Sequence, residues 1–295
     1  EEMPKKTPNM IYDFEDCDEN TFMRELPYDQ YILLENLFDP QHIPFAHHKL
    51  QSVREKASPV KIKKLHEDEN IFSLYFEDNT WNFGNNTYRN GTMNFLMPFY
   101  YFMHNKYPES NIVHALCIPV SEGNSRIFIK NQSEKKTIFN KFPSWIKHMM
   151  TNKFLDSDSL LLTKQEQTIR KYNNGSIYNP LKLYKLPTSG DSSTILFNKW
   201  ASKHLSNIPY FHKTSYNNYD LDRKKILNRY EQHTKNCKDC LKNYNNINDF
   251  KINSHIIFKH GKKYIYGKVS KIKAVYIDII DENYNSYTKH IINND

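Results

Sequence analysis

The sequence contains few cysteines and no long apolar segment. Its four cysteines are too few for a disulfide framework in a chain of 295 residues, so we expect a reducing compartment. No apolar run approaches the roughly 20 residues that a membrane-spanning helix needs. The opening residues EEMPKKTPNM have the pattern of neither a signal peptide nor a transit peptide. The sequence therefore predicts a soluble chain, in the plastid or in the cytoplasm.

The charge of the chain is too dispersed to identify a partner. Lys and Arg number 41 against 33 for Asp and Glu, a formal net charge of +8. The lysines are scattered among Asn, Ile and Tyr, and there are only seven glycines, as a general compositional bias would produce. We interpret the excess as a solvated basic surface and expect no nucleic acid partner. Aromatic residues make up 14% of the chain, which favours a globular fold with a real core.

The apolar pattern predicts an α+β domain with two flanking segments. Polar residues 1–25 predict a connector, and residues 26–245 the main domain. From residue 59 to about residue 130, β-branched and aromatic runs predict an antiparallel meander, with TMNFLMPFYYFM as one strand. Helical periodicity predicts helices over 143–171, 192–205 and 221–244. Residues 250–295 predict four short strands with turns at HG, SK and DEN, a small β-barrel appendage of unknown role.

The stretch ENLFDPQHIPFAHHKL concentrates candidate metal ligands. On a straight α-helix, His42 and His47 would lie about 140° apart and could not share an ion. Pro44 removes a backbone donor and breaks the helix, so both imidazoles could turn inward. Two histidines and a carboxylate on one face of Fe(II) leave positions open for dioxygen and substrate, although zinc could take the same ligands. No H-E-x-x-H is present to suggest a metalloprotease.

A purely structural interpretation of the same stretch is also open. Asp39 could cap a helix whose first residue is Pro40, with the histidines on a polar surface. The spacing of the two histidines alone does not decide between a cap and a metal site.

Further segments support the metal site by their order along residues 20–245. They are IPVSEGNSR (118–126), LPTSGDSSTILFNKW (186–200) and RYEQHTKNCKDC (229–240). With ENLFDPQHIPFAH, they resemble the catalytic domain of Rieske non-haem iron oxygenases, specifically the pheophorbide a oxygenase group. In that group, a strand ending in E-N-L is followed by D-P-x-H-x-P-x-x-H. The resemblance implies O2-dependent oxygenation of an aromatic or chlorophyll-derived tetrapyrrole substrate.

The resemblance also implies a third iron ligand from the long helix, where Asp is followed seven residues later by Gln. Asp158 with Gln165 fits this pattern, and Asp156 is the competitor. The helical neighbours of Asp158 are Phe154, Leu155, Leu161 and Leu162, an apolar face that predicts burial. Those of Asp156 are Asn152, Lys153, Ser159 and Leu160, a mostly solvated face. A buried carboxylate needs a partner, and iron is the candidate; a hydrogen bond to backbone or histidine is the alternative.

The resemblance assigns roles to the remaining residues of the motif. His42, His47 and Asp158 would hold Fe(II), and Asn36 would support the site. Asp39 would be hydrogen-bonded to the second nitrogen of an iron-bound histidine and relay electrons to the iron. The neighbouring His48 receives no role.

The implied fold is a helix-grip (START/Bet v 1-like) antiparallel sheet around the long helix. The active site would lie in a tunnel between them, lined by aromatic strands, although the same strands would also serve a plain core.

The chain departs from the family in its cysteines. A Rieske [2Fe–2S] cluster needs two Cys-x-His-type pairs, and the sequence contains no C-x-H and no C-x-x-H. We therefore expect the cluster to come from a missing domain or a separate protein, fed by a ferredoxin or reductase. Family members often form homotrimers, so that one subunit's cluster meets the next subunit's iron.

Cys237 and Cys240 form a C-x-x-C pair on a predicted basic helix. A basic helix would lower a thiol pKa and favour a redox pair, and the resemblance suggests a switch addressed by thioredoxin. Inert thiols are the alternative, and a lone C-x-x-C is only a weak zinc signal. For the whole chain, the alternative to an enzyme is a non-catalytic helix-grip protein that binds a hydrophobic ligand.

Overall fold

A computed structural model gives the fold of the chain. It describes residues 21–79, 81–82, 85–86, 88–107, 110–133, 142–205 and 222–248, and the strands within 255–290. The chain forms two compact units, Glu1–His233 and Thr234–Asp295.

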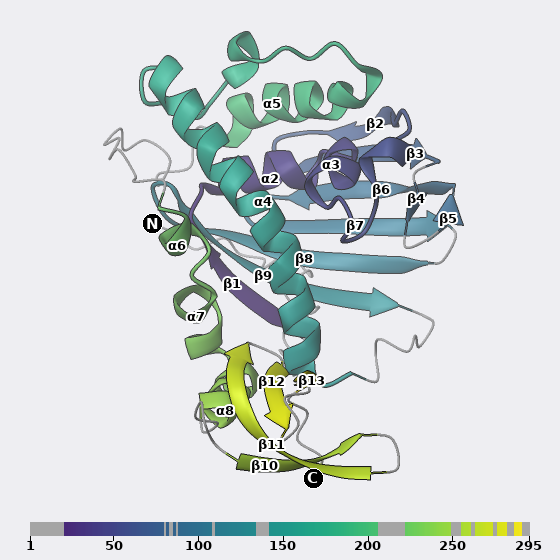
Figure 1. The fold of residues 1–295 in the computed structure, drawn as a ribbon. Coiled ribbons are helices and arrows are strands. Elements are labelled where there is room, and N and C mark those ends of the chain that lie inside the picture. The colour runs from purple at the N-terminus through teal and green to yellow at the C-terminus, as the bar shows by residue number, and fades with distance from the viewer. Residues whose placement is uncertain are drawn as a thin grey trace, which may run out of the picture. The chain divides into compact units, whose positions relative to one another are not determined.

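A seven-stranded antiparallel sheet is the base of the first unit (Figure 1), with the order β1-β9-β8-β7-β6-β3-β2. Its strands are β1 (Phe22–Leu26), β2 (Lys61–Glu67), β3 (Ile71–Asp78), β6 (Arg89–Leu96), β7 (Tyr100–Tyr107), β8 (Asn111–Ser121) and β9 (Asn124–Ser133). Two further short strands, β4 (Trp81–Asn82) and β5 (Asn85–Asn86), pair with each other. Strands β2 to β9 of the sheet are neighbours in chain order, which confirms the predicted antiparallel meander.

Two strand boundaries differ from the prediction. TMNFLMPFYYFM is divided between β6 and β7, which pair with each other, because Pro98 between them has no N–H to donate to a ladder. Residues 1–25 were expected to form a connector, but Phe22–Leu26 are β1 and pair with β9. The sheet therefore starts earlier than residue 26.

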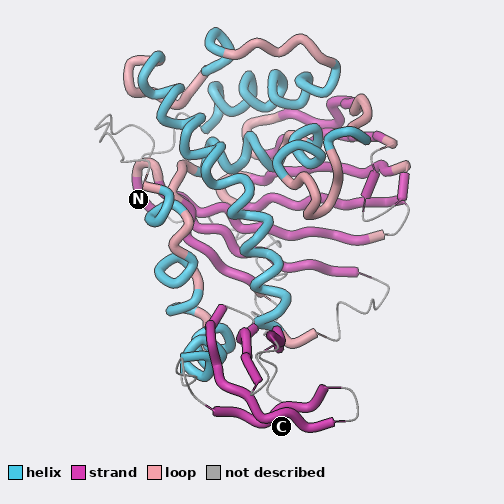
Figure 2. The backbone as a smooth tube through the Cα atoms, in the orientation of Figure 1, coloured by secondary structure: helices cyan, strands magenta, loops and turns pink. Residues whose placement is uncertain are grey.

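The helices of the first unit lie against the sheet (Figure 2). They are α2 (Gln30–Leu37), α3 (Ile43–Ala46), α4 (Ser144–Tyr172), α5 (Ser192–His204), α6 (Arg223–Ile226) and α7 (Arg229–Gln232). Short 3-10 turns are η2 (Pro40–His42), η3 (Arg54–Lys56), η5 (Pro180–Leu183) and η6 (Ser189–Asp191). Helices α4 and α5 confirm two predicted helices to within a residue at each end. Helix α2 contacts β8 and β9 on one side and α4 and α5 on the other.

The expected strand ending in E-N-L is instead helix α2. The side chain of Asp29 caps it by accepting from the backbone N–H of Tyr31. Its first six residues, Gln30 to Glu35, are all buried. A short apolar run that is buried on every side has no periodicity to separate helix from strand, which explains the wrong prediction.

The single helix predicted over 221–244 is also wrong. The segment contains α6, α7, the 3-10 turn η9 (Thr234–Asn236) and α8 (Lys238–Asn248). The Asn228 side chain caps α7 by accepting from the backbone of Glu231. The Gln232 side chain donates to the carbonyl of Ile226 at the end of α6. Side chains thus satisfy the backbone groups that a continuous helix would pair internally.

The buried guanidinium of Arg24 anchors β1 to the helices. It donates to the Gln232 side chain at 2.7 Å and to the Asn152 carbonyl at 3.1 Å. It also forms an ion pair with Asp156 at 2.7 Å, and Asp156 pairs in turn with Arg229. This network gives a structural contact to the Arg of the RYEQH segment, because Arg229 pairs with the same carboxylate as Arg24.

The strands expected to line a substrate tunnel contribute to the core. Met93, Phe95 and Tyr101 are almost completely buried and belong to the main apolar cluster. The alternative of a plain core therefore holds for these three side chains. Trp200 from α5 packs into the same cluster, stacked on Phe72 with ring centroids 5.3 Å apart.

The second unit has its own antiparallel sheet in the order β10-β11-β12-β13. Its strands are β10 (His255–His260), β11 (Lys263–Lys273), β12 (Tyr276–Asp281) and β13 (Ser286–His290). The four strands were predicted, whereas the turns predicted at HG and DEN lie outside the described residues. Strand β11 runs through SK, where a turn was also predicted, with only a register shift. Each described strand pairs with its neighbour in sequence, and the barrel stays a prediction. The second unit begins at Thr234 and therefore includes α8 (Lys238–Asn248). The prediction had placed most of this helix in the main domain.

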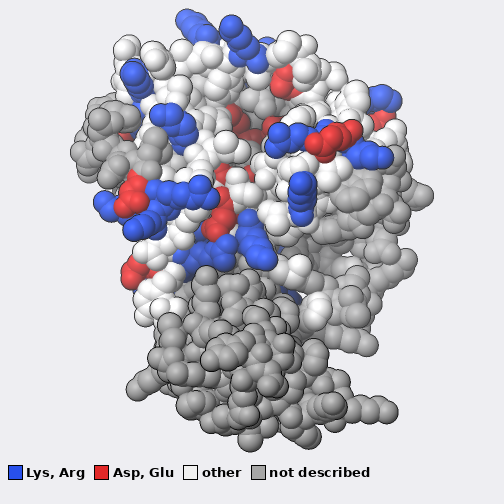
Figure 3. Space-filling model, viewed as in Figure 1, with Lys and Arg blue, Asp and Glu red and all other residues white. Residues whose placement is uncertain are grey.

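Charged side chains of the first unit are spread over the face shown in Figure 3. Lys and Arg appear beside Asp and Glu over several elements. Exposed pairs such as Lys61 with Glu77 and Lys64 with Glu67 show the same mixing. Such pairs contribute little to stability.

Replacing Trp200 tests the core. Its side chain is fully buried and its Nε1 donates to the Asp68 carbonyl at 2.6 Å. We expect Trp200→Ala to lower the free energy of unfolding by about 3–5 kcal/mol in urea denaturation, because it leaves a cavity. The neighbouring Lys199 is exposed, and Lys199→Ala should change stability by less than about 0.5 kcal/mol. Equal effects of the two substitutions would contradict this packing.

Candidate metal centre

The histidine segment follows α2 and is not a continuous helix. The Asp39 carboxylate accepts from the Gln41 N–H and caps η2, whose first residue is Pro40. Helix α3 then starts anew at Ile43. This break brings the Nε2 atoms of His42 and His47 to 3.2 Å from each other. The predicted convergence of the two imidazoles is present, and so is the cap that was considered as its alternative.

Asp158 of α4 completes the group. Its Oδ2 lies 3.6 Å from Nε2 of His47, and ligand atoms of His42, His47 and Asp158 all lie within 4.8 Å of one another. Asp158 is 6% exposed, and the Asn36 side chain is hydrogen-bonded to it. The structure thus brings together the predicted residues from segments more than a hundred positions apart.

The surroundings of the two aspartates differ in part from the prediction. Leu155 and Leu162 beside Asp158 are buried, but Leu161 is 59% exposed. Asp156 is not solvated, because it forms ion pairs with Arg24 and Arg229. The choice of Asp158 over Asp156 agrees with the geometry, and the reason is that Asp156 already has cationic partners.

Both imidazoles use Nδ1 for other contacts. Nδ1 of His42 is hydrogen-bonded to the backbone carbonyl of Asp39, and Nδ1 of His47 lies 2.8 Å from Ser157 Oγ. Because a carbonyl only accepts, His42 carries a proton on Nδ1, and in the neutral ring its Nε2 is then the atom that can accept or bind a metal. Sequence reasoning assigned the contact with His42 to the Asp39 carboxylate, and the structure shows the carbonyl in that place. It assigned nothing to Ser157.

The electrostatics of the group suit a cation. Burial, and then the charge of His42, lower the pKa of His47 to about 3, so this ring is neutral at physiological pH. Burial raises the pKa of Asp158 to about 6, and the His42 charge opposes this rise. The Nε2 atom of His47 lies 3.2 Å from Nε2 of His42 and 3.6 Å from Oδ2 of Asp158. Adjacent ligand atoms that bind one ion at about 2.1 Å are roughly 3 Å apart, so both distances are close to those of a metal site. Two histidines and one carboxylate therefore fit Fe(II) in composition and in spacing.

A buried carboxylate behind the group was missed in the sequence. Glu35 is 5% exposed and accepts hydrogen bonds from three side chains. They are Gln165 at 2.5 Å, Tyr184 at 2.8 Å and Asn198 at 2.7 Å. Burial raises the pKa of Glu35, and the three hydrogen bonds oppose this rise because they stabilise the carboxylate. Glu35 and Gln165 both belong to recognised motif segments, and their contact explains why α4 needs Gln165.

The PTSGD segment packs against the histidine segment. Thr188 and Asp191 form a reciprocal capping box around η6. A Cβ added at Gly190 would lie 2.4 Å from the side-chain oxygen of Gln41, so a larger residue there would displace the Gln41 side chain. Gln41 immediately precedes His42, and η6 therefore supports the turn that carries this candidate ligand.

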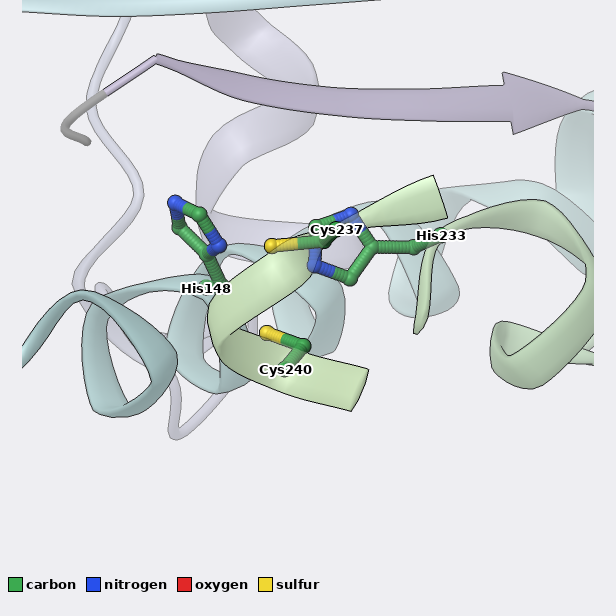
Figure 4. A group of neighbouring side chains, drawn as sticks. All are labelled: His148, His233, Cys237 and Cys240. Carbon is green, nitrogen blue, oxygen red and sulfur yellow. The ribbon is translucent and has the colours of Figure 1, made fainter. Parts of the chain in front are cut away.

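His148 and His233 lie at the β1 edge of the first unit. Their rings pack edge to face with centroids 5.1 Å apart (Figure 4). His233 also stacks on Phe22 of β1 at 4.6 Å, and its Nδ1 is hydrogen-bonded to the Met23 carbonyl at 2.5 Å. The histidine of RYEQH thus fastens the end of α7 to β1.

Cys237 and Cys240 belong to the second unit, next to and within the first turn of α8 (Figure 4). A hydrogen bond to Cys237, followed by burial, raises the pKa of Cys240. The prediction that a basic helix lowers the thiol pKa is therefore wrong for Cys240. The ionisable groups that act on it, Cys237 and Asp239, are acidic rather than basic.

Comparison with known proteins finds sequence similarity along much of the chain. Residues 92–176 match the family model of pheophorbide a oxygenase. Pheophorbide a oxygenase of Oryza sativa subsp. japonica is 27% identical over 269 residues, which cover 81% of this chain and 49% of that protein. The chain is a homologue of pheophorbide a oxygenase.

The chain is also similar to proteins with other names. Flavonoid 8-hydroxylase 2 of Ocimum basilicum is 28% identical over 270 residues, 80% of this chain and 48% of its own. The chain spans about half the length of the curated relatives it matches. Among solved structures, dicamba monooxygenase bound to 3,6-dichlorosalicylic acid has a TM-score of 0.45 at 10% identity, over 63% of this chain and 60% of that one. None of the helices in the described part of the homologue is both long and apolar enough to span a membrane.

The raised pKa of Asp158 predicts a stability difference without metal. The folded state holds the Asp158 proton more tightly than the unfolded chain, so this contribution to stability is lost as pH rises from about 4 to about 6. At about pH 8, the free energy of unfolding of metal-free Asp158→Asn should therefore exceed that of metal-free wild type by up to about 3 kcal/mol. The measurement is denaturant unfolding of both proteins. The difference should disappear near pH 4.

Asp156→Asn is the matched control on the same helix. It leaves the buried Arg24 without its carboxylate partner and should destabilise the protein at about pH 8. If both variants were destabilised to the same extent, the assignment of Asp158 as a buried carboxylate without a cationic partner would be wrong.

Proposed function

We propose that this chain provides the mononuclear iron and substrate-binding part of a Rieske-type oxygenase. The observation that carries the proposal is the convergence of three possible ligand atoms. Nε2 of His42 faces Nε2 of His47 at 3.2 Å, and Oδ2 of Asp158 lies 3.6 Å from the latter. Two imidazole nitrogens and a carboxylate oxygen that converge in this way could share one cation. Homology to pheophorbide a oxygenase supports iron as that cation.

The three residues would hold Fe(II), which when bound supplies the redox chemistry that reduces dioxygen for attack on substrate. The Nδ1 contacts of both histidines would leave the Nε2 atoms of the neutral rings to bind the ion. The Asn36 side chain orients the Asp158 carboxylate. Asp39 is proposed as the residue that relays electrons, because it lies in contact with His42 through its carbonyl.

Electrons would come from a Rieske [2Fe–2S] cluster, itself reduced by a ferredoxin or reductase. The four cysteines of this sequence form no C-x-H pair, so the cluster would be supplied from outside the 295 residues. A homotrimer would place the cluster of one subunit next to the iron of another.

The proposed substrate is an aromatic compound or a chlorophyll-derived tetrapyrrole, bound between the sheet and α4 in a helix-grip arrangement. The names of two relatives refer to pheophorbide a and to a flavonoid, and both proteins are named as chloroplastic. We therefore propose a plastid location and test both substrate classes.

Iron loading tests the proposed centre directly. Anaerobic titration with Fe(II) should show stoichiometric binding to wild type and a loss of affinity of at least about 100-fold in His47→Ala, because a ligand is removed. With a reduced Rieske protein supplied, loaded wild type should convert pheophorbide a or a flavonoid in a single turnover. His48→Ala is the control, since His48 contacts Glu55 and Arg54 outside the group.

Full iron binding in His47→Ala would overturn the assigned ligands. Tight binding of either compound, with no product from the loaded protein, would instead favour a non-catalytic protein that binds hydrophobic ligands.

We also propose that Cys237 and Cys240 form a redox switch addressed by thioredoxin. The hydrogen bond between their sulfur atoms places them within reach of a disulfide. Mass spectrometry after mild oxidation should find them linked in wild type, with the linkage reversed by thioredoxin. Cys237→Ser should show no such linkage, and a wild type without it would remove the switch.

A further inference from the structure

Ser157 contacts the candidate iron ligand His47 from the helix that also carries Asp158. Its Oγ lies 2.8 Å from Nδ1 of His47 and 2.6 Å from the carbonyl oxygen of Phe154, three residues earlier in α4. The His47 ring also packs edge to face on the Phe154 ring, with centroids 5.3 Å apart. The imidazole is therefore held by two residues of one helical turn.

The direction of the two hydrogen bonds follows from the chemistry of the groups. Two oxygen atoms 2.6 Å apart need a proton between them. The carbonyl of Phe154 has none, so Ser157 donates its single hydroxyl proton to it. The serine oxygen can then only accept from His47, and the proton of the His47 ring must be on Nδ1.

We propose that Ser157 is the positioning residue that fixes the Nδ1-protonated tautomer of His47 and aims its Nε2 at the metal. This inference rests on the proposed function, since it concerns a ligand of the proposed iron centre. It adds a role for a residue that no motif marks. A neutral imidazole with the proton on Nε2 could not bind the ion through that atom.

The two histidines are fixed in different ways. Nδ1 of His42 donates to the backbone carbonyl of Asp39, a contact that no side-chain substitution at Asp39 removes. Nδ1 of His47 depends on a hydroxyl that a single substitution removes. The orientation of His47, unlike that of His42, can therefore be changed by a substitution at a residue that is not itself a ligand.

Ser157→Ala tests the proposal with two measurements that do not depend on turnover. In metal-free protein, nitrogen-15 NMR should show the His47 proton on Nδ1 in wild type and shared between both nitrogens in the variant. Anaerobic Fe(II) titration should show affinity about 10–100-fold weaker than in wild type, the range for outer partners of metal ligands. The electron paramagnetic resonance spectrum of the iron–nitric oxide adduct should also change. Ser157→Thr keeps the hydroxyl and should restore all three.

Thr151→Ala is the matched control. Thr151 lies in the same helix and donates to the carbonyl of Lys147 at 3.0 Å, as Ser157 does to Phe154, but has no contact with the ligand group. Its removal should leave the His47 tautomer and iron affinity unchanged.

The outcomes separate this inference from the proposed function. If wild type binds no iron, the proposed function fails, whatever the NMR result. If wild type binds iron and Ser157→Ala has the same tautomer, affinity and adduct spectrum, only the role of Ser157 is overturned. If Ser157→Ala and Thr151→Ala lost iron affinity to the same extent, the role of Ser157 would be limited to stabilising the helix.

Discussion

The contact between α2 and α4 is the constraint on which the candidate metal centre depends. Glu35 of α2 accepts from Gln165 of α4, and the neighbouring Asn36 reaches Asp158, seven residues or about two turns away on the same helix. These two contacts, two turns apart along α4, fix both the position of α4 along its axis and its rotation relative to α2. The histidine segment leaves directly from the end of α2, so the same contacts determine where Asp158 meets His47.

The charges around this contact separate structural carboxylates from candidate ligands. Asp156, Asp29 and Glu166 pair with arginines in the first unit. Glu35 and Asp158, in contrast, have neutral or histidine partners within the described interactions, and burial raises the pKa of both. Keeping such carboxylates ionised costs free energy that a bound cation can offset. Of these two carboxylates, only Asp158 faces the two histidines, whereas Glu35 is satisfied by three side-chain donors.

The parts of this fold that follow from local periodicity could be predicted. Helix α4 has a long repeating apolar face, and the meander strands alternate, so both were placed closely. Helix α2 could not be, because it is buried on all sides and its sequence lacks a polar face. In the site, Asp158 was indicated by the family pattern of Asp followed seven residues later by Gln, and its apolar helical neighbours favoured it over Asp156. Ser157 and Glu35 were not, because their roles depend on partners 110 and 130 residues away, and no spacing rule carries that information.

Asp39 shows how one residue can satisfy two interpretations that the sequence left open. Its carboxylate caps η2, and its carbonyl accepts from His42. The two groups are separate, so orienting His42 does not require the carboxylate. Substitution of the Asp39 side chain would leave the carbonyl in place and disturb only the cap and any relay. Loss of electron transfer in such a variant, with iron affinity kept, would therefore point to the relay and not to a misplaced ligand.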